Sequence, residues 1–361
     1  MSWNPLLDAP PFPASGYAPL ADRIGALLGT KNDVLLVQGE AIIALEAAAS
    51  SLARPGLRAL NIITSPYGAL FGRWLRRGGA EVTDLAALPG KPITAEAVEA
   101  ALQAGPVDLV ALVHAESASG ILNPLPQIAR LARQAGALVV VDAVASFGGH
   151  ALDVDALGID IAVVGPQKSL GGAAGVSALS VSPAAWQRIA APGELTASTL
   201  SLLDLRTGWL DTGRGALPGM PSAIEFHALA ATLDRFETEG LRNTIARHAT
   251  AGAASRAGLV ALGLTPWVDE AEASNLVTAA MLPEGVDRAA LLAAITHLGA
   301  GIGAAIGPGT ERLVRLNHTG PNARFAPVLA NVVAVGAGLR ALGVPAPIGA
   351  AAEAVAGAYA A

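Results

Sequence analysis

Cysteine is absent from this chain of 361 residues. A fold held together by disulfides is therefore excluded, as is a zinc site built on cysteine ligands. Blocks of basic residues are also missing, and the formal net charge is −6. This charge distribution argues against nucleic acid and anionic membranes as partners.

Long uninterrupted hydrophobic runs are missing too. The N-terminus has no basic segment followed by a long apolar stretch, so no signal peptide is predicted. The apolar stretch 326–361 is interrupted by Asn331, Arg340 and Pro345, which predicts buried helices and not a membrane span. We therefore expect a cytoplasmic protein without a membrane partner.

The residues that are present indicate an α/β enzyme. Hydrophobic residues make up 52% of the chain and charged residues 14%, with 41 glycines. Continuous apolar runs alternate with helical patterns, and such runs predict a mostly parallel sheet with helices on both faces. The predicted strands of this sheet lie at 34–37, 57–63, 108–114, 137–142 and 159–164.

The pattern changes along the chain and predicts three parts. Residues 1–16 are rich in proline and are expected to form an extended arm, and residues 17–240 to form the large domain. Residues 241–361 are expected to form a smaller α+β domain, because their strands are less apolar. The strands expected there are 275–281 and 312–317, the helices are 288–298 and 322–342, and a helix at 221–239 links the domains.

Asp142 and Lys168 are the most informative pair. Asp142 ends one apolar run, and Lys168 closely follows the next one. Ligands of open parallel sheets bind beyond the carboxyl ends of the strands. A lysine that forms a Schiff base with an aldehyde, together with a carboxylate that pairs with a pyridinium nitrogen, is what pyridoxal chemistry needs. We therefore predict that these two residues are catalytic, and we predict no metal.

Further candidates follow other predicted strands. In the segment His-Ala-Glu-Ser-Ala-Ser-Gly (114–120), Ser117 is a donor for the phenolic oxygen of the ring, and His114 and Glu116 shape the site. Tyr67, between a strand and a helix, offers an aromatic face for stacking. Arg315, near the end of a strand of the small domain, is the candidate for the substrate carboxylate.

The start of the first helix after a buried strand is a further candidate. Glu40, Ala41 and Ile42 stand at the N-terminus of a predicted helix, where free N–H groups form an anion site. A carboxylate there would repel a phosphate and would instead accept a hydrogen bond from a hydroxyl group. The alternative is that Glu40 is an ordinary residue of a first helical turn.

Several blocks together resemble the class V aminotransferases of fold type I, which include alanine–glyoxylate and serine–glyoxylate aminotransferases. The resemblance extends over residues 17–345. It implies pyridoxal 5′-phosphate (PLP) chemistry on amino acids and 2-oxo acids, and a homodimer with active sites at the interface. It also implies that Gln167 lies near the 5′ substituent of the ring. The blocks are HAESASGILNPL (114–125), VDAVASFGG (141–149), GPQKSLG (165–171) and VRLNHTG (314–320).

Within this family, the chain is most similar to members that take unphosphorylated pyridoxamine as a substrate, with pyruvate as the amino acceptor. Those members have a glutamate at the position of Glu40. Three departures from the family pattern stand beside this similarity. The N-terminal segment that covers the site is short, Met220 replaces a threonine that contacts phosphate from the partner subunit, and the loop 305–311 lacks a second carboxylate-binding arginine, for which Arg312 is a substitute.

Other functions remain open at this point. The first is an aminotransferase of the alanine/serine–glyoxylate type with bound PLP, and the second is a β-eliminating lyase on the same fold. A cysteine desulfurase is excluded because the chain has no cysteine. A binding protein without catalytic activity is the last alternative.

Overall fold

The computed structural model describes residues 9–190, 198–299 and 301–360. The first part of the chain contains η1 (Ala14–Gly16), α1 (Tyr17–Leu28), β1 (Asp33–Gln38), α2 (Ala41–Leu52), β2 (Arg58–Ile63), α3 (Pro66–Arg77), β3 (Glu81–Ala86), α4 (Ala95–Gln103), β4 (Leu109–Val113), α5 (Leu125–Gln134), β5 (Leu138–Asp142), α6 (Val154–Leu157), β6 (Ile161–Val164), β7 (Val176–Val181), α7 (Pro183–Ile189), α8 (Leu202–Leu205), η2 (Arg206–Leu210) and α9 (Ala223–Glu239). The second part contains α10 (Leu241–Ala261), β8 (Thr265–Pro266), η3 (Glu270–Glu272), β9 (Val277–Met281), α11 (Arg288–Ile295), η4 (Thr296–Leu298), β10 (Ile302–Ala304), β11 (Leu313–Asn317), η5 (Gly320–Asn322), α12 (Phe325–Ala341) and α13 (Ile348–Ala360).

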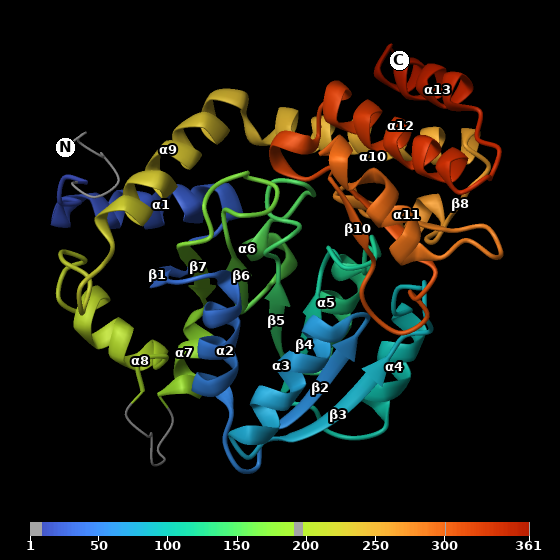
Figure 1. The fold of residues 1–361 in the computed structure, drawn as a ribbon. Helices are drawn as coiled ribbons and strands as arrows, with labels where there is room; N and C mark the ends of the chain where they lie inside the picture. The colour runs from blue at the N-terminus through green and yellow to red at the C-terminus, as the bar shows by residue number, and fades with distance from the viewer. Residues whose placement is uncertain (1–8, 191–197, 300, 361) are drawn as a thin grey trace.

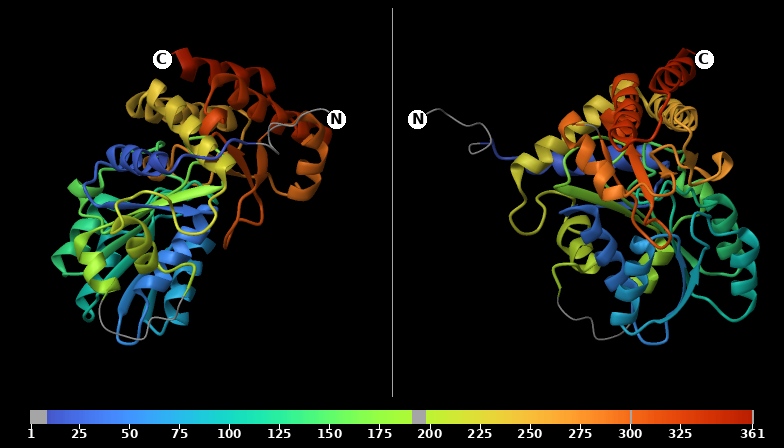
Figure 2. Two further views of the ribbon diagram at one scale, coloured as in Figure 1. Left: turned by 90° about the vertical axis from the view of Figure 1, so that its left-hand side faces the viewer. Right: turned by 45° about the vertical axis from the view of Figure 1, so that its right-hand side comes forward.

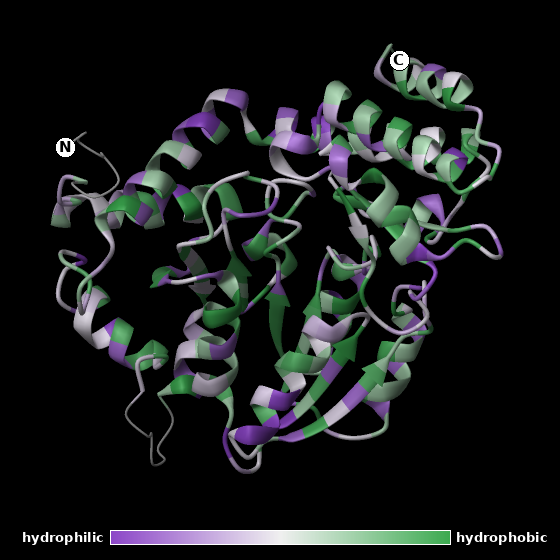
Figure 3. Ribbon diagram, in the orientation of Figure 1, coloured by the Kyte–Doolittle hydropathy of each residue, from purple (hydrophilic) through white to green (hydrophobic). Residues whose placement is uncertain are grey.

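The larger sheet of the described residues has seven strands in the order β1-β7-β6-β5-β4-β2-β3 (Figure 1). Its pairs from β2 to β6 are parallel, which confirms the predicted α/β fold class. The prediction missed β3 and β7. β3 is an edge strand with charged residues, and β7 contains two serines among its apolar residues and runs antiparallel to both neighbours, so neither strand is a continuous apolar run. Figure 3 shows the contrast between the hydrophobic β5 and the hydrophilic positions along β3.

The direction in which the chain crosses this sheet reverses between β2 and β4. From β2 the chain moves outward to β3, whereas from β4 it moves to β5 and then to β6. Right-handed crossovers therefore place the helices of the two halves on opposite faces. In agreement, α2 packs against α3, and α4 packs against α5 (Figure 1). Such a reversal opens a crevice beyond the carboxyl ends of the strands, where ligands bind.

The central strands end level with one another at this crevice. Asp142, the last residue of β5, pairs with Val113 of β4 and with Val163 of β6. Every residue of β4 and β6 is buried, because helices cover both faces of these strands. The loops that follow β4, β5 and β6 consequently begin side by side.

The second part of the chain forms a smaller sheet with helices beside it. Its strand order is β10-β11-β9-β8, and all three pairs are antiparallel. Buried residues between Ala251 and Val355 form a core cluster of their own. Figure 2 shows this part in orange and red, gathered at one end of the molecule. The helix predicted at 221–239 is α9, which meets α10 at Gly240, and the domain boundary at 240 stays a prediction.

The predicted arm is described only from residue 9. Residues 9–13 have neither helix nor strand, and a single turn, η1, follows them. Phe12 packs against Tyr17 of α1 and Phe226 of α9, whereas residues 1–8 lie outside the described residues. None of the helices that the structure describes is long and apolar enough to cross a membrane.

Candidate active site

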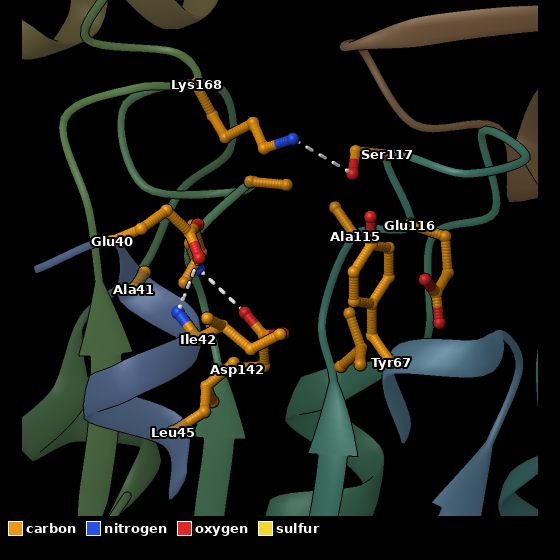
Figure 4. A pocket seen from close by; sticks show the side chains of 13 residues that line it. Glu40, Ala41, Ile42, Leu45, Tyr67, Ala115, Glu116, Ser117, Asp142 and Lys168 are labelled. Atoms are coloured by element: carbon orange, nitrogen blue, oxygen red, sulfur yellow. Dashed lines mark hydrogen bonds between the residues drawn. The ribbon is translucent and has the colours of Figure 1, made fainter. Parts of the chain in front are cut away.

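Most of the predicted site residues meet around one cavity of about 250 Å³ beyond the carboxyl ends of the strands (Figure 4). Each comes from a different strand end: Glu40 after β1, Tyr67 after β2, Ser117 after β4, Asp142 from β5 and Lys168 after β6. Ala41 and Ile42 also line the cavity. Five separate loops thus converge on one space, as expected for a ligand site of an open parallel sheet.

Lys168 enters the cavity from the loop after β6. Its Nζ lies 3.5 Å from the Ser117 hydroxyl oxygen. Burial lowers the pKa of this amine, and the positive charge of Arg315 lowers it further, while Glu40 and Asp142 oppose the shift. A lysine with a lowered pKa has a larger neutral fraction, and the neutral amine is the nucleophile.

Asp142 lies across the cavity from Lys168 in Figure 4. Burial raises the pKa of this carboxyl group to about 6, and the charge of Glu40 raises it too, while the Val144 N–H and Lys168 lower it. The Val144 N–H donates to its Oδ1 over 3.0 Å. At neutral pH the group is therefore mostly ionised and is able to hold a proton on a ligand nitrogen.

Glu40 caps the N-terminus of α2 with its own side chain. Its Oε2 accepts a hydrogen bond from the Ile42 N–H over 2.9 Å, and its Oε1 accepts one from the Gln167 side chain over 2.6 Å. An N-cap carboxylate satisfies a free N–H and interacts favourably with the helix dipole. Gln167 is not a lining residue of the cavity, but it orients the carboxylate that is.

Tyr67 stands in the first turn of α3. The Ser65 hydroxyl caps this helix by accepting from the Tyr67 N–H over 3.2 Å, and Pro66 occupies the first helical position. The Tyr67 side chain is 39% exposed and presents its ring to the cavity (Figure 4). The helix cap thus fixes the backbone from which this ring projects.

Arg315 reaches the site from β11 of the smaller sheet. Its guanidinium donates to the Ser117 carbonyl oxygen over 2.6 Å, while its Nε is buried without a hydrogen-bond partner. It does not line the cavity itself. Arg312, the suggested substitute for a second arginine, is exposed and donates to the Leu282 carbonyl oxygen over 2.8 Å, so it is not at the cavity.

Met220 is not brought to this cavity. Its side chain is 96% exposed, on the loop before α9. Within a single chain it therefore cannot contact a ligand next to Lys168, and a role for it requires a second subunit.

Five lining residues were missed from the sequence: Leu45, Val113, Ala115, Val144 and Ala145. Val144 and Ala145 lie two and three residues after Asp142, so their place in the block 141–149 was the signal that pointed to them. Leu45 faces the cavity one turn into α2, and nothing in its sequence context distinguishes it from a core residue. Among the described residues, no group of three or more His, Asp or Glu is arranged to hold a metal ion.

Comparisons with known proteins identify the family of this chain. A family model for class V aminotransferases matches residues 16–312. Pyridoxamine–pyruvate transaminase of Mesorhizobium japonicum is 34% identical over 91% of this chain and 84% of its own length. Alanine–glyoxylate aminotransferase of Callithrix jacchus is 32% identical over 84% of this chain and 75% of its own length. The crystal structure of pyridoxamine–pyruvate aminotransferase from Mesorhizobium loti is 32% identical and has a TM-score of 0.90, over 96% of this chain and 89% of that chain.

Proposed function

This protein belongs to the class V aminotransferase family and is a PLP-type transaminase, and we propose that its amino donor is unphosphorylated pyridoxamine and its acceptor a small 2-oxo acid such as pyruvate. The family resemblance read from the sequence is thereby confirmed. The choice of pyridoxamine depends on a single observation. The N-terminus of α2, the natural place for a phosphate, already holds the carboxylate of Glu40.

A phosphate at this helix end would compete with Glu40 for the same donors. The Ile42 N–H and the Gln167 amide both donate to this carboxylate. A second anion about 4 Å away costs roughly 1 kcal/mol in water and about 4 kcal/mol at an effective dielectric constant of 20. Because Glu40 is exposed, the lower part of this range applies. A neutral hydroxymethyl group carries no such cost and is able to donate to the carboxylate.

The charges around the cavity favour a cationic ligand as well. Apart from the buried acid Glu116, two carboxylates line it, those of Glu40 and Asp142, against one lysine. Pyridoxamine carries an ammonium group and a ring nitrogen that can be protonated, so it matches this balance better than a phosphate ester does.

The chain supplies the groups that pyridoxal chemistry requires. When bound, the pyridine ring supplies an electron sink. In the proposal, Lys168 would present its neutral amine to the reacting carbon and carry a proton, and Asp142 would keep the ring nitrogen protonated. Tyr67 stacks on the ring, and Ser117 donates to its phenolic oxygen.

Two buried atoms without hydrogen-bond partners suit the rest of the substrates. The Oε1 of Gln167 is an acceptor beside Glu40, at the end proposed for the ring hydroxymethyl group. The Nε of Arg315 is a donor close to Ser117, suited to the carboxylate of the 2-oxo acid. Arginine binds carboxylates through two parallel hydrogen bonds, which fixes the orientation of the acid.

Assembly as a homodimer in the cytoplasm is part of the proposal. The exposed Met220 would then face the ring held by the partner subunit, at the position where a threonine would contact phosphate. An apolar side chain there offers no hydrogen bond to a phosphate group. This agrees with the proposal, based on Glu40, that the ring is unphosphorylated.

The test is turnover by purified protein without added PLP. Pyridoxamine and pyruvate should give pyridoxal and alanine in equal amounts. Turnover that requires PLP, with alanine or serine as donor and glyoxylate as acceptor, would support the alternative, which the similarity to alanine–glyoxylate aminotransferase favours. Formation of pyruvate from an amino acid without amino transfer would instead indicate a β-eliminating lyase.

A further inference from the structure

Glu116 is a buried acid for which the proposed chemistry has no use. It lies in the loop after β4, directly before Ser117, and its side chain is 0% exposed. Its own backbone is fixed, because its N–H donates to the Ile121 carbonyl over 2.8 Å and its carbonyl accepts from the Gly120 N–H over 2.9 Å. Figure 4 shows its carboxyl group beside the ring of Tyr67 and directed away from Lys168.

One oxygen of Glu116 is tied to the turn that carries Tyr67. The Thr64 hydroxyl lies 2.5 Å from Oε1 and also accepts from the Asn123 amide over 2.8 Å. Because the NH2 of Asn123 can only donate, the hydroxyl hydrogen of Thr64 is free to point to Glu116. Asn123 is itself held, since it donates to the Val113 carbonyl and accepts from the Ile93 N–H.

The other oxygen, Oε2, is buried without a hydrogen-bond partner among the described residues. Ionised, it would be an unsatisfied negative charge in the interior, a costly arrangement. Burial, together with the charge of Asp142, raises the pKa of Glu116 to about 7, although the Ser65 and Thr64 hydroxyls oppose the rise. The neutral acid is thus the form that fits the geometry.

No neighbouring group among the described residues offers a counter-charge to an ionised Glu116. Asp142 on β5 is itself negative when ionised, and the side chain of Tyr67 on α3 carries no positive charge. His114, two residues earlier, is neutral because burial lowers its pKa to about 4. Across the cavity, the amine of Lys168 lies among Ser117, Asp142 and Glu40, and Arg315 is bound to the Ser117 carbonyl oxygen.

We propose that Glu116, as a neutral acid, is a positioning residue that fixes the Tyr67 turn against the Ser117 loop. Through Thr64 it holds the turn in which Ser65 caps α3 and orients Tyr67. Through the chain it precedes Ser117, whose carbonyl is held by Arg315. The inference rests on the roles proposed above for Tyr67 and Ser117 as contacts of the ring.

The experiment compares Glu116→Gln, Glu116→Ala and Thr64→Val with a control, Glu99→Gln, which removes an exposed carboxylate on α4. Two quantities are measured: the melting temperature of the ligand-free protein from pH 5 to pH 9, and the affinities for pyridoxal and for PLP by absorbance titration. Glutamine keeps the acceptor for Thr64 but cannot ionise. Thr64→Val removes the hydroxyl that donates to Glu116 and keeps the shape of the side chain. This variant tests the same hydrogen bond if Glu116→Ala does not fold.

We expect Glu116→Gln to bind within about two-fold of the wild type at pH 6, and Glu116→Ala and Thr64→Val to bind about ten-fold more weakly. We also expect the melting temperature of the wild type and of Glu99→Gln to fall from pH 6 to pH 8 more than that of Glu116→Gln. Wild-type affinity in Thr64→Val, or a loss in Glu116→Gln equal to that in Glu116→Ala, would overturn the inference. If the wild type prefers PLP, the proposed function fails, and the same comparison is then read from the PLP titration.

Discussion

The residues proposed for the chemistry and the residue proposed to select the ligand are held in different ways. Asp142 and Lys168, which we call the reacting end, are partly buried, and burial moves the pKa of the acid up and that of the amine down. Glu40, which we call the far end, is exposed and is held by hydrogen bonds from its own chain, through Ile42 and Gln167. Partly buried ionisable groups at strand ends have the shifted pKa values that proton transfer needs. A carboxylate that caps a helix at the rim of the cavity instead determines which ligand can bind there. We therefore propose that Asp142 and Lys168 determine the catalytic class and that Glu40 determines which ring is bound.

The largest expected effect tests the reacting end. Lys168→Ala removes the nucleophile and the proton carrier together, so turnover should fall by about 10³-fold or more. The melting temperature of the ligand-free protein should not fall, because a partly buried amine is removed. If the variant retains turnover in single-turnover assays, Lys168 is not the catalytic lysine.

Asp142→Asn should separate activity from stability. Loss of the charge-assisted hydrogen bond to the ring nitrogen should lower turnover by about 10- to 100-fold. In the folded wild type the pKa of Asp142 is raised to about 6, so the stability that its neutral form contributes is fully present below about pH 4 and is lost as pH rises through 6.

The ligand-free variant should therefore melt higher than the wild type at pH 8, and the difference should shrink at pH 5. Wild-type turnover should itself fall as the pH drops below about 6. A variant that is less stable than the wild type at pH 8 would contradict this account of the buried carboxyl group.

Arg315→Lys tests the contact with the 2-oxo acid, near the reacting end. Lysine keeps the charge but not the paired donors of arginine, so the KM for pyruvate should rise about ten-fold while the affinity for pyridoxal changes little. Arg312→Lys is the matched control, because Arg312 binds the Leu282 carbonyl away from the cavity. An equal rise in both variants would remove Arg315 from the substrate site.

Met220→Thr is the smallest expected effect and tests the far end across subunits. On an exposed position its effect on stability should stay within about 0.5 kcal/mol. The affinity for PLP should rise about two- to three-fold if the hydroxyl reaches a phosphate in the partner subunit. Light scattering gives the oligomeric state, and a monomer with unchanged PLP affinity would contradict the proposed dimeric site.

The sequence predicted the reacting end better than its surroundings. Asp142 and Lys168 follow continuous apolar strands, and parallel strands bring such positions together, so the pair was predictable from local pattern. The hydrogen bond from Gln167 to Glu40 joins residues 127 positions apart, and no local pattern contains it. The strands β3 and β7 were missed because an edge strand and a serine-rich strand lack the apolar signal.

The role of Glu116 could not be predicted from the sequence either, because it depends on a contact between residues that are distant in the chain. Its burial and its contact with Thr64, 52 positions away, depend on how β2 and β4 pair in the sheet. The sequence showed only a glutamate in a loop with a glycine at its end, a pattern equally typical of a solvated turn.

The central claim is that Glu40 excludes phosphate, and Glu40→Ser tests it most directly. Serine is a good N-cap, so α2 keeps its cap while the negative charge is lost. The control is Glu46→Gln, which removes another carboxylate of α2, one that pairs with Arg77. Affinities for pyridoxal and for PLP are measured by absorbance titration of all three proteins. We predict that the wild type and the control bind pyridoxal at least as tightly as PLP, and that Glu40→Ser shifts the ratio toward PLP by about ten-fold. A wild type that binds PLP far more tightly, or a ratio that Glu40→Ser leaves unchanged, would contradict the account.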